Sequence, residues 1–426
     1  MRDAHAGEAR KVALAGMLLM IVAMGIGRFA YTPLLPGLRE ALGWSLAQAG
    51  DVASANYFGY VVGALVAATI AAAAPQRRWL VLGAIASALT TGAGVAVVSG
   101  YGWLLLRAGS GVASAFVLVL GTAIVTRRLL SLGRPGLIAL HFAGVGIGIL
   151  FTVLLVELAR IGGLSVFGQW AMLGIACAAC TIPALVLLLG DAGAAADTGM
   201  APVGAKPGGA TAATSTDAAA VATGSAVASA ASVAETRAAV PVAIAPRWLL
   251  GRLITAYGLF GFGYVVTATF IVEMARGLPD ARLAEPLAWL AVGLCAIPST
   301  AFWQWVAARL GTWRALRIAF ATEAVGVLLA GYGTGALALA VGGGLLGGTF
   351  VGITAIGLAA GRRIAPARVD RVIGWMTAAF GLGQWIGPAV AGRLAEASGG
   401  FGLPSLVAAG LLAIGVALLR APEPAA

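Results

Sequence analysis

Apolar residues form long runs along this chain, and short polar segments separate them. The first run, residues 12–36, is about long enough to cross a hydrocarbon layer of roughly 30 Å as a helix. Similar runs follow along the whole chain. They predict an all-α membrane protein with twelve spans, over residues 13–35, 51–73, 79–98, 103–125, 137–158, 168–190, 248–272, 286–307, 314–333, 336–360, 372–394 and 401–420.

The stretch between the sixth and seventh predicted spans has a different composition. Residues 191–240 contain no Leu, Ile, Phe, Trp or Tyr and consist mostly of small residues. Such a segment cannot bury enough apolar surface to fold on its own. We therefore predict an N-terminal six-helix half (1–190), a disordered cytoplasmic linker (191–246) and a C-terminal six-helix half (247–426).

Composition and charge agree with a membrane protein. Of the 426 residues, 60% are hydrophobic and 10% are charged, against about 25% charged in soluble domains. About 20 of the 27 Lys and Arg residues fall on one side of the predicted spans, and the positive-inside rule makes that side cytoplasmic. We expect both termini in the cytoplasm. The same bias explains the net charge of +11 without a nucleic-acid partner.

The two predicted halves share a weak internal repeat. Three sequence features return at nearly one offset: Gly25 as Gly261 (236 residues), Gly146 as Gly381 (235 residues) and Arg127 as Arg362 (235 residues). A parallel repeat of two six-helix units has its axis along the membrane normal. Transporters built this way bind substrate between the halves, near the midplane of the bilayer.

Several motifs resemble the major facilitator superfamily. The run from Arg107 to Gly111 is similar to its Arg-x-x-x-Gly motif, and residues 308–314 resemble one copy of its loop motif, with Ala308 where an acid is common. More narrowly, GIGRFAYTPLLP (25–36), SANYFGYVVGAL (54–65) and GWMTAAFGLGQWIGPAVAG (374–392) resemble the YbfB/YjiJ group of that superfamily. The resemblance implies a transporter fold in the bacterial cytoplasmic (inner) membrane, without naming a substrate.

Two arginines inside predicted spans are the leading site candidates. An arginine in hydrocarbon costs about 2.5 kcal/mol or more unless it faces water or a partner. Arg28 and Arg107 should lie at a similar depth, and the resemblance implies that their spans line a central cavity. Their planar forks suit a carboxylate or phosphate. The alternative is internal neutralisation, with Asp51 or Glu157 reaching Arg107.

Polar and aromatic residues at neighbouring levels complete the predicted substrate site. Tyr264 is in register with Arg28 at the 236-residue offset, so the second half offers a hydroxyl where the first offers a charge. Gln384 is a lone amide in an apolar run and needs a partner. The full set of substrate-binding candidates is Arg28, Arg107, Tyr31, Asn56, Tyr57, Tyr60, Tyr264 and Gln384. For the aromatic members, simple packing is the competing interpretation.

Two titratable residues are candidates for proton coupling. Glu323 lies near the middle of the ninth span, and His141 lies near the inner end of the fifth. A buried carboxyl or an imidazole can titrate near neutral pH. The fold implied by the resemblance makes the ninth span peripheral, so a structural role is the competing interpretation for Glu323. His141 has the same alternative.

The sequence favours a secondary transporter over an enzyme. It contains no GxxxxGK[ST] phosphate loop, no metal-ligand spacing and no catalytic triad within the spans. Cys177 and Cys180 form a CxxC in an apolar helix and are interpreted as packing residues. We predict alternating access for a small, anionic organic solute, with proton coupling, membrane lipids as surroundings and no cofactor. A transport-inactive receptor or a lipid-handling protein on the same fold is the alternative.

Overall fold

The structure is a computed structural model that describes residues 2–73, 75–190 and 247–420. The predicted linker at 191–246 lies outside these residues. In chain order the main helices are α1 (Arg2–Met20), the π-helix η1 (Ile21–Ile26), α2 (Tyr31–Leu42), α3 (Leu46–Ala73), α4 (Gln76–Gly92), α5 (Gly100–Ser131), α6 (Ile138–Ile161), α7 (Val166–Leu189), α9 (Arg247–Arg276), α10 (Ala281–Leu310), α11 (Thr312–Tyr332), α12 (Ala336–Ile364), α13 (Val369–Ser398) and α14 (Gly402–Leu418).

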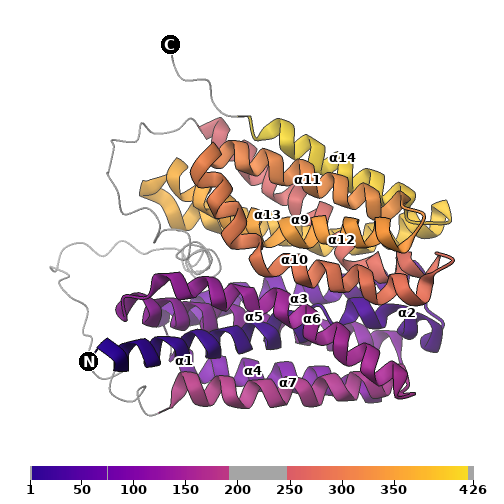
Figure 1. Cartoon of the computed structure of the whole chain (residues 1–426), viewed down its shortest axis with the longest axis horizontal. Helices are drawn as coiled ribbons and strands as arrows, with labels where there is room; N and C mark the ends of the chain where they lie inside the picture. The colour runs from indigo at the N-terminus through magenta and orange to yellow at the C-terminus, as the bar shows by residue number, and fades with distance from the viewer. Residues whose placement is uncertain (1, 74, 191–246, 421–426) are drawn as a thin grey trace.

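These helices form twelve spans in two bundles of six. Within the described residues, ten helical segments are long and apolar enough to cross a membrane, and α1, η1 and α2 together make the first of them. The shorter apolar helix α14 and the 30-residue α13 are the other two spans. Figure 1 shows the N-terminal bundle beside the C-terminal bundle, with α3 and α10 near the boundary. The prediction of a twelve-helix membrane fold is confirmed.

The internal repeat is visible where the two bundles meet. The hydroxyl of Thr32 in α2 donates a 2.7 Å hydrogen bond to the carbonyl of Ala268 in α9, across 236 residues of sequence. That separation is the repeat offset, so equivalent positions of the two halves touch one another. Two equivalent positions can meet only close to the axis that relates the halves. The axis therefore passes near Thr32.

The first span differs from the continuous helix that its apolar pattern predicts. After α1, residues 21–26 adopt π-helical geometry and residues 27–30 form a turn before α2 begins. The N–H of Phe29 bonds to the carbonyl of Met24 at 2.9 Å, five residues back. A break of this kind frees backbone carbonyls in the membrane interior, where other groups must satisfy them. Arg28 lies within the turn.

Close packing of glycines holds the broken segment against α6. A methyl group added to Gly25 would lie 2.4 Å from the α-carbon of Gly148, well inside van der Waals contact. The hydroxyl of Thr152, one turn further along α6, donates to the carbonyl of Gly25 at 3.1 Å. Small residues permit this close approach of backbones in a membrane. The pair of glycines thus positions the turn that carries Arg28.

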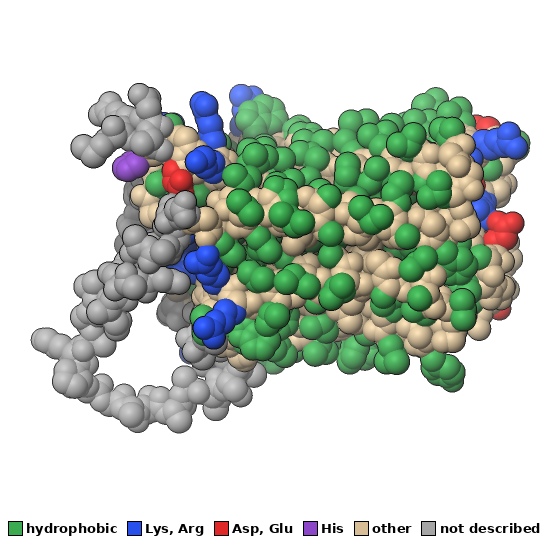
Figure 2. Space-filling view, turned by 90° about the horizontal axis from the view of Figure 1, so that it is seen from below, with side chains coloured by type: hydrophobic (Ala, Val, Ile, Leu, Met, Phe, Trp, Pro, Cys, Tyr) green, Lys and Arg blue, Asp and Glu red, His purple; other side chains and the backbone are tan. Residues whose placement is uncertain are grey.

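Charged side chains gather at the two ends of the molecule, and an apolar belt lies between them (Figure 2). One end, where α4, α11 and α13 begin, is rich in arginine and is here named the basic end. At the opposite end acids and arginines pair, and it is here named the paired end. The chain direction places α2, the start of α3 and the end of α9 at the paired end.

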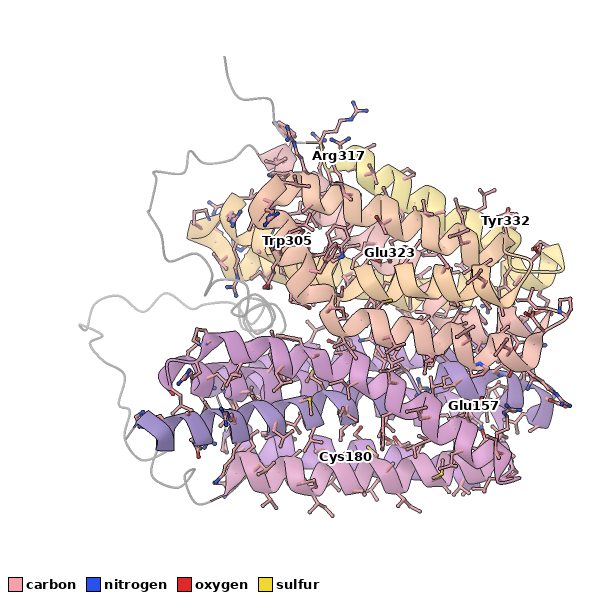
Figure 3. The ribbon with its side chains drawn as sticks, viewed as in Figure 1. Glu157, Cys180, Trp305, Arg317, Glu323 and Tyr332 are labelled. Atoms are coloured by element: carbon pink, nitrogen blue, oxygen red, sulfur yellow. The ribbon has the colours of Figure 1, made fainter. Side chains whose placement is uncertain are left out.

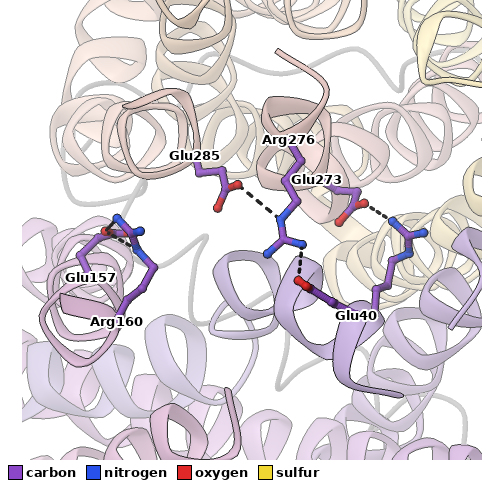
Figure 4. Close-up of polar contacts among 7 residues, drawn as sticks. Glu40, Glu157, Arg160, Glu273, Arg276 and Glu285 are labelled. Atoms are coloured by element: carbon purple, nitrogen blue, oxygen red, sulfur yellow. Dashed lines mark hydrogen bonds and ion pairs between the residues drawn. The ribbon is translucent and has the colours of Figure 1, made fainter. Parts of the chain in front are cut away.

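Ion pairs join the two halves at the paired end. Arg39 of α2 pairs with Glu273 of α9, and Figure 4 shows Arg276 lying between Glu40 and Glu285. Arg276 is 3.1 Å from Glu40, which belongs to the other half. A further pair joins α13 to α3, because both terminal nitrogens of Arg393 bond to the carboxylate of Asp51, at 2.6 and 2.9 Å. The paired end is therefore closed by contacts between the halves.

Candidate functional site

A cavity of about 840 Å³ lies between the two halves. Its wall is contributed by η1, α3, α5 and α6 on one side and by α9, α10, α12 and α13 on the other. The lining parts of α3 (58–65), α12 (350–358) and α13 (371–385) run from the middle of each helix towards the basic end. The cavity therefore occupies the middle of the bundle and its basic half, while the paired end stays closed.

Arg28 is the deepest charge of the cavity wall. It is buried, and the guanidinium carbon lies 4.6 Å from the ring centre of Tyr57 and 4.4 Å from that of Tyr60. Two of its nitrogens, Nε and Nη2, have no hydrogen-bond partner among the described residues. The aromatic rings stabilise the charge through their electron-rich faces. The two nitrogens remain able to donate to a bound group.

Tyr264 and Gln384 face the same cavity from the second half. The amide nitrogen of Gln384 donates to the Tyr264 hydroxyl, while its Oε1 is buried and has no partner within the described residues. The Tyr264 ring is almost parallel to two others, at 5° to Phe350 and 3° to Phe380, with centroids 5.6 and 5.7 Å away. All of these residues line the cavity. The second half thus presents a ring stack beside an unsatisfied acceptor.

Arg107 has a different environment from Arg28. Its Nη1 and Nη2 donate to the carbonyls of Gly27 and Arg28, each at 3.1 Å, and its guanidinium lies over the Tyr31 ring at 5.0 Å. Ser110, one turn later on α5, also donates to the Gly27 carbonyl, at 3.0 Å. These carbonyls are the ones that the break in the first span frees. Arg107 is not part of the cavity wall and instead supports the turn that bears Arg28.

The two acids predicted as possible partners for Arg107 are engaged elsewhere. Glu157 pairs with Arg160 on its own helix, at 2.6 Å, and Asp51 pairs with Arg393 across the halves. The alternative in which Asp51 or Glu157 neutralises Arg107 is therefore not the one that the structure shows. Backbone carbonyls take that role, because a broken helix exposes acceptors that an intact helix would use internally.

The second half shows the converse arrangement. At the 236-residue offset Arg107 corresponds to Gly343, and the corresponding first span of that half, α9, is helical without interruption. With no freed carbonyls to satisfy, this half needs no arginine at that position. The arginine and the break occur together, which favours a supporting role for Arg107.

The other predicted substrate contacts fall into two groups. Tyr60 lines the cavity, whereas Tyr57 contacts Arg28 but is not part of the cavity wall. Asn56 donates to the Arg107 carbonyl at 3.0 Å, and the Tyr31 hydroxyl donates to the Ala49 carbonyl at 2.8 Å. Asn56 and Tyr31 are buried outside the cavity wall. They belong to the shell that orients Arg28 and Arg107.

Neither coupling candidate reaches the cavity. Figure 3 places Glu323 of α11 inside the C-terminal half. Both of its carboxyl oxygens are buried without a hydrogen-bond partner in the described structure, and the neighbouring Thr349 hydroxyl bonds to carbonyls of its own helix. His141 is buried in the N-terminal half, with Nε2 3.0 Å from the Thr122 hydroxyl. Both lie outside the cavity wall.

Sequence reasoning missed much of the aromatic wall. Phe350, Phe380, Tyr257, Trp375 and Trp385 line the cavity but carry no charge or motif that marks them as a group. Phe380 and both tryptophans lie within the 374–392 motif, and that is the one sequence signal that points to them.

The mouth of the cavity was missed as well. In the sequence Arg371 is one of several basic residues in a loop region. In the structure it lies near the start of α13 and forms part of the cavity wall at the basic end. Arg28 and Arg371 are the only charged side chains among the described lining residues, and one lies at the deepest part of the cavity and the other near its mouth.

A known family matches the sequence across nearly its whole length. The family described as "Uncharacterised MFS-type transporter YbfB" matches residues 20–216 and 208–420. The chain belongs to this family. It is thus a multi-pass membrane protein of the major facilitator superfamily, a superfamily of transporters, and the resemblance found in its motifs is confirmed. No curated protein sequence matches the chain.

Solved structures support the same fold. The chain is similar to a mutant of the nucleoside transporter NupG, with 15% identity, a TM-score of 0.69 and coverage of 96% of this chain and 98% of that one. It is also similar to the human organic anion transporter MFSD10, with 19% identity, a TM-score of 0.63 and coverage of 97% and 99%. At these identities the likeness shows the fold alone.

Proposed function

We propose that this protein is a secondary active transporter that moves a small organic anion across the bacterial cytoplasmic membrane by alternating access. The observation that carries the proposal is Arg28, a buried cation with two unused donors at the deepest part of a cavity that has no acid in its described wall. Such a charge is stable in a membrane when water or an anion can reach it.

Alternating access fits the asymmetry between the two ends. The cavity extends through the basic half, and three ion pairs join the halves at the paired end. Breaking contacts at one end while forming others is how two bundles rock around a central site. We therefore assign this structure to the state that faces the basic end. In the proposal, residues 191–246 tether the two halves on the cytoplasmic side.

Replacing Glu273 with Gln is expected to shift the protein towards the state open at the paired end. Glu273 is the most buried member of the three pairs, and the loss of one such pair costs about 1 kcal/mol, or roughly fivefold in population. A cysteine placed at Thr32, in a background without native cysteines, should then react several times faster with an external maleimide. Glu157→Gln is the matched control, because that pair lies within one helix. Equal reaction rates in both variants would argue that the Arg39–Glu273 ion pair does not hold the paired end closed.

Both termini and residues 191–246 are proposed to be cytoplasmic, in line with the positive-inside rule. Single cysteines at Gly162 and Gly399, which are exposed at the paired end, should label in intact cells with an impermeant reagent. A single cysteine at Gly208 should label only after the membrane is permeabilised. Labelling of the cysteine at position 208 in intact cells would show that the protein has the opposite orientation in the membrane. The cavity would then open to the outside of the cell.

Proton coupling is part of the proposal, but Glu323 is not assigned to it. The carboxyl lies in the C-terminal half, outside the cavity wall, so a substrate at Arg28 has no direct contact with it. We expect Glu323→Gln to keep at least half of the proton-driven uptake and to melt no lower than the unaltered protein. Complete loss of that uptake in a folded protein would instead make Glu323 the coupling site.

Uptake by purified protein in proteoliposomes tests the function. Small labelled organic anions should accumulate when an inward proton gradient is imposed and should stop accumulating when a protonophore is added. Saturable binding without any uptake would instead identify a receptor on this fold. Movement of labelled lipid between leaflets, without solute uptake, would identify a lipid-handling protein.

A further inference from the structure

Three unsatisfied polar atoms belong to residues of the cavity wall. Arg28 contributes the donors Nε and Nη2, and Gln384 contributes the acceptor Oε1. Gln384 is hydrogen-bonded to the Tyr264 hydroxyl, and Arg28 lies within electrostatic range of that same group. The donors and the acceptor thus come from opposite halves and belong to the wall of one cavity. Buried polar atoms without partners are rare in proteins, and at a cavity they mark the positions where a ligand completes the bonding.

The charges limit the ligand to one negative group. A guanidinium with two free donors matches the two oxygens of a carboxylate in a fork-to-fork contact. Arg28 is the only charged residue at depth in the described wall, since Arg371 lies near the basic end of α13. A second negative charge on the ligand would be buried among rings without compensation. A monocarboxylate satisfies the site, whereas a phosphate ester or a dicarboxylate leaves charge unpaired.

The remaining wall is shaped for an aromatic body. Nine of the 28 lining residues are Phe, Tyr or Trp, against 8% of the whole chain. The parallel stack of Phe350, Tyr264 and Phe380 includes the ring whose hydroxyl is bonded to Gln384. Aromatic rings gain from offset or edge contacts with one another beyond the effect of buried area. A flat ring is therefore held better here than an aliphatic body of the same size.

We propose, resting on the transport function above, that the solute is a planar aromatic monocarboxylate with a hydrogen-bond donor on its ring. The carboxylate accepts from Nε and Nη2 of Arg28, and the ring packs against Phe350 and Phe380. A ring hydroxyl or N–H donates to Oε1 of Gln384. These contacts satisfy all three free polar atoms at once.

Calorimetric titration of the purified full-length protein tests the class with five probes: 3-hydroxybenzoate, 4-hydroxybenzoate, benzoate, benzamide and cyclohexanecarboxylate. Benzoate is expected to bind at least tenfold more tightly than benzamide, which lacks the charge, and several times more tightly than the non-aromatic acid. One of the hydroxybenzoates should bind about fivefold more tightly than benzoate, because it gains a hydrogen bond.

A substitution then locates the donor contact. Gln384→Met should remove the advantage of the hydroxyl, so that the hydroxybenzoates and benzoate bind to the variant with affinities within about twofold of one another. Gln169→Met is the matched control. That buried amide, in the first turn of α7, donates to the Leu164 carbonyl outside the cavity wall, so the variant should leave the advantage intact. Equal binding of benzamide and benzoate, or a hydroxyl advantage that survives in Gln384→Met, would overturn the proposal. The probe series on the unaltered protein tests the ligand class even if the variant fails to fold.

The two levels of the proposal fail in different ways. If no aromatic acid binds but proteoliposomes accumulate another anion, the transport function stands and the substrate class is wrong. If aromatic acids bind in the predicted order but are never accumulated, the site is as inferred and the transport function is wrong.

Discussion

Arg28→Gln is expected to abolish uptake of the anionic solute while the protein still folds. The substitution removes the two charge-assisted hydrogen bonds that the free nitrogens can make. At about 1.5 kcal/mol each, their loss weakens ligand affinity by roughly 100-fold. Folding should survive because the guanidinium makes no hydrogen bond through Nε or Nη2 within the described residues, and a neutral amide is cheaper to bury. Titration of the hydroxybenzoates, together with the melting temperature in detergent, measures both effects.

Two further variants make this result specific. Arg28→Lys should restore little affinity, because an ammonium cannot reproduce the paired geometry of the guanidinium. Arg317→Gln removes an exposed arginine of α11 that lies outside the cavity wall and should leave affinity unchanged. Unchanged affinity in Arg28→Gln, with uptake intact, would move Arg28 to a structural role and remove the main support for an anionic solute.

The twelve spans were predictable because hydrocarbon imposes a length and an apolar composition on each of them. The predicted boundaries fall within a few residues of most observed helices, for example 138–161 against the predicted 137–158. The repeat also relates Tyr264 to Arg28, and both residues line the cavity. These properties depend on side-chain chemistry at regular spacing, which a single sequence displays directly.

The break in the first span could not be read in the same way. Gly25 and Gly27 permit it, but glycine is common throughout this chain, with 62 in total. The hydrogen-bond partners of Arg107 could not be predicted either, because they are backbone carbonyls and every residue has one. Asp51 and Glu157 were plausible partners for Arg107 because of their charge, but both are paired with other arginines. The aromatic wall could not be predicted for a related reason. Phe, Tyr and Trp residues that line a cavity look the same in a sequence as those that pack in the interior.

Arg107→Met is expected to destabilise the folded protein more than Arg28→Gln does. The methionine has a similar volume but no donors, so the Arg28 carbonyl loses its hydrogen bond and the Gly27 carbonyl keeps only Ser110. An unsatisfied buried carbonyl costs about 1–3 kcal/mol, and the membrane interior offers no water to replace the bond. A total loss of about 2–5 kcal/mol should appear as a clear fall in melting temperature in detergent.

Ligand binding then separates a supporting role from a direct one. Arg107 supports the turn and does not contact the solute, so Arg107→Met should weaken the binding of charged and neutral aromatic probes by similar factors. Arg28→Gln should weaken the binding of the charged probes only. Ser110→Ala removes one of the two donors to the Gly27 carbonyl and should give a smaller effect of the same kind. If Arg107→Met melts like the unaltered protein and loses only the charged probes, then Arg107 contacts the solute, and the broken helix is held by its glycine packing alone.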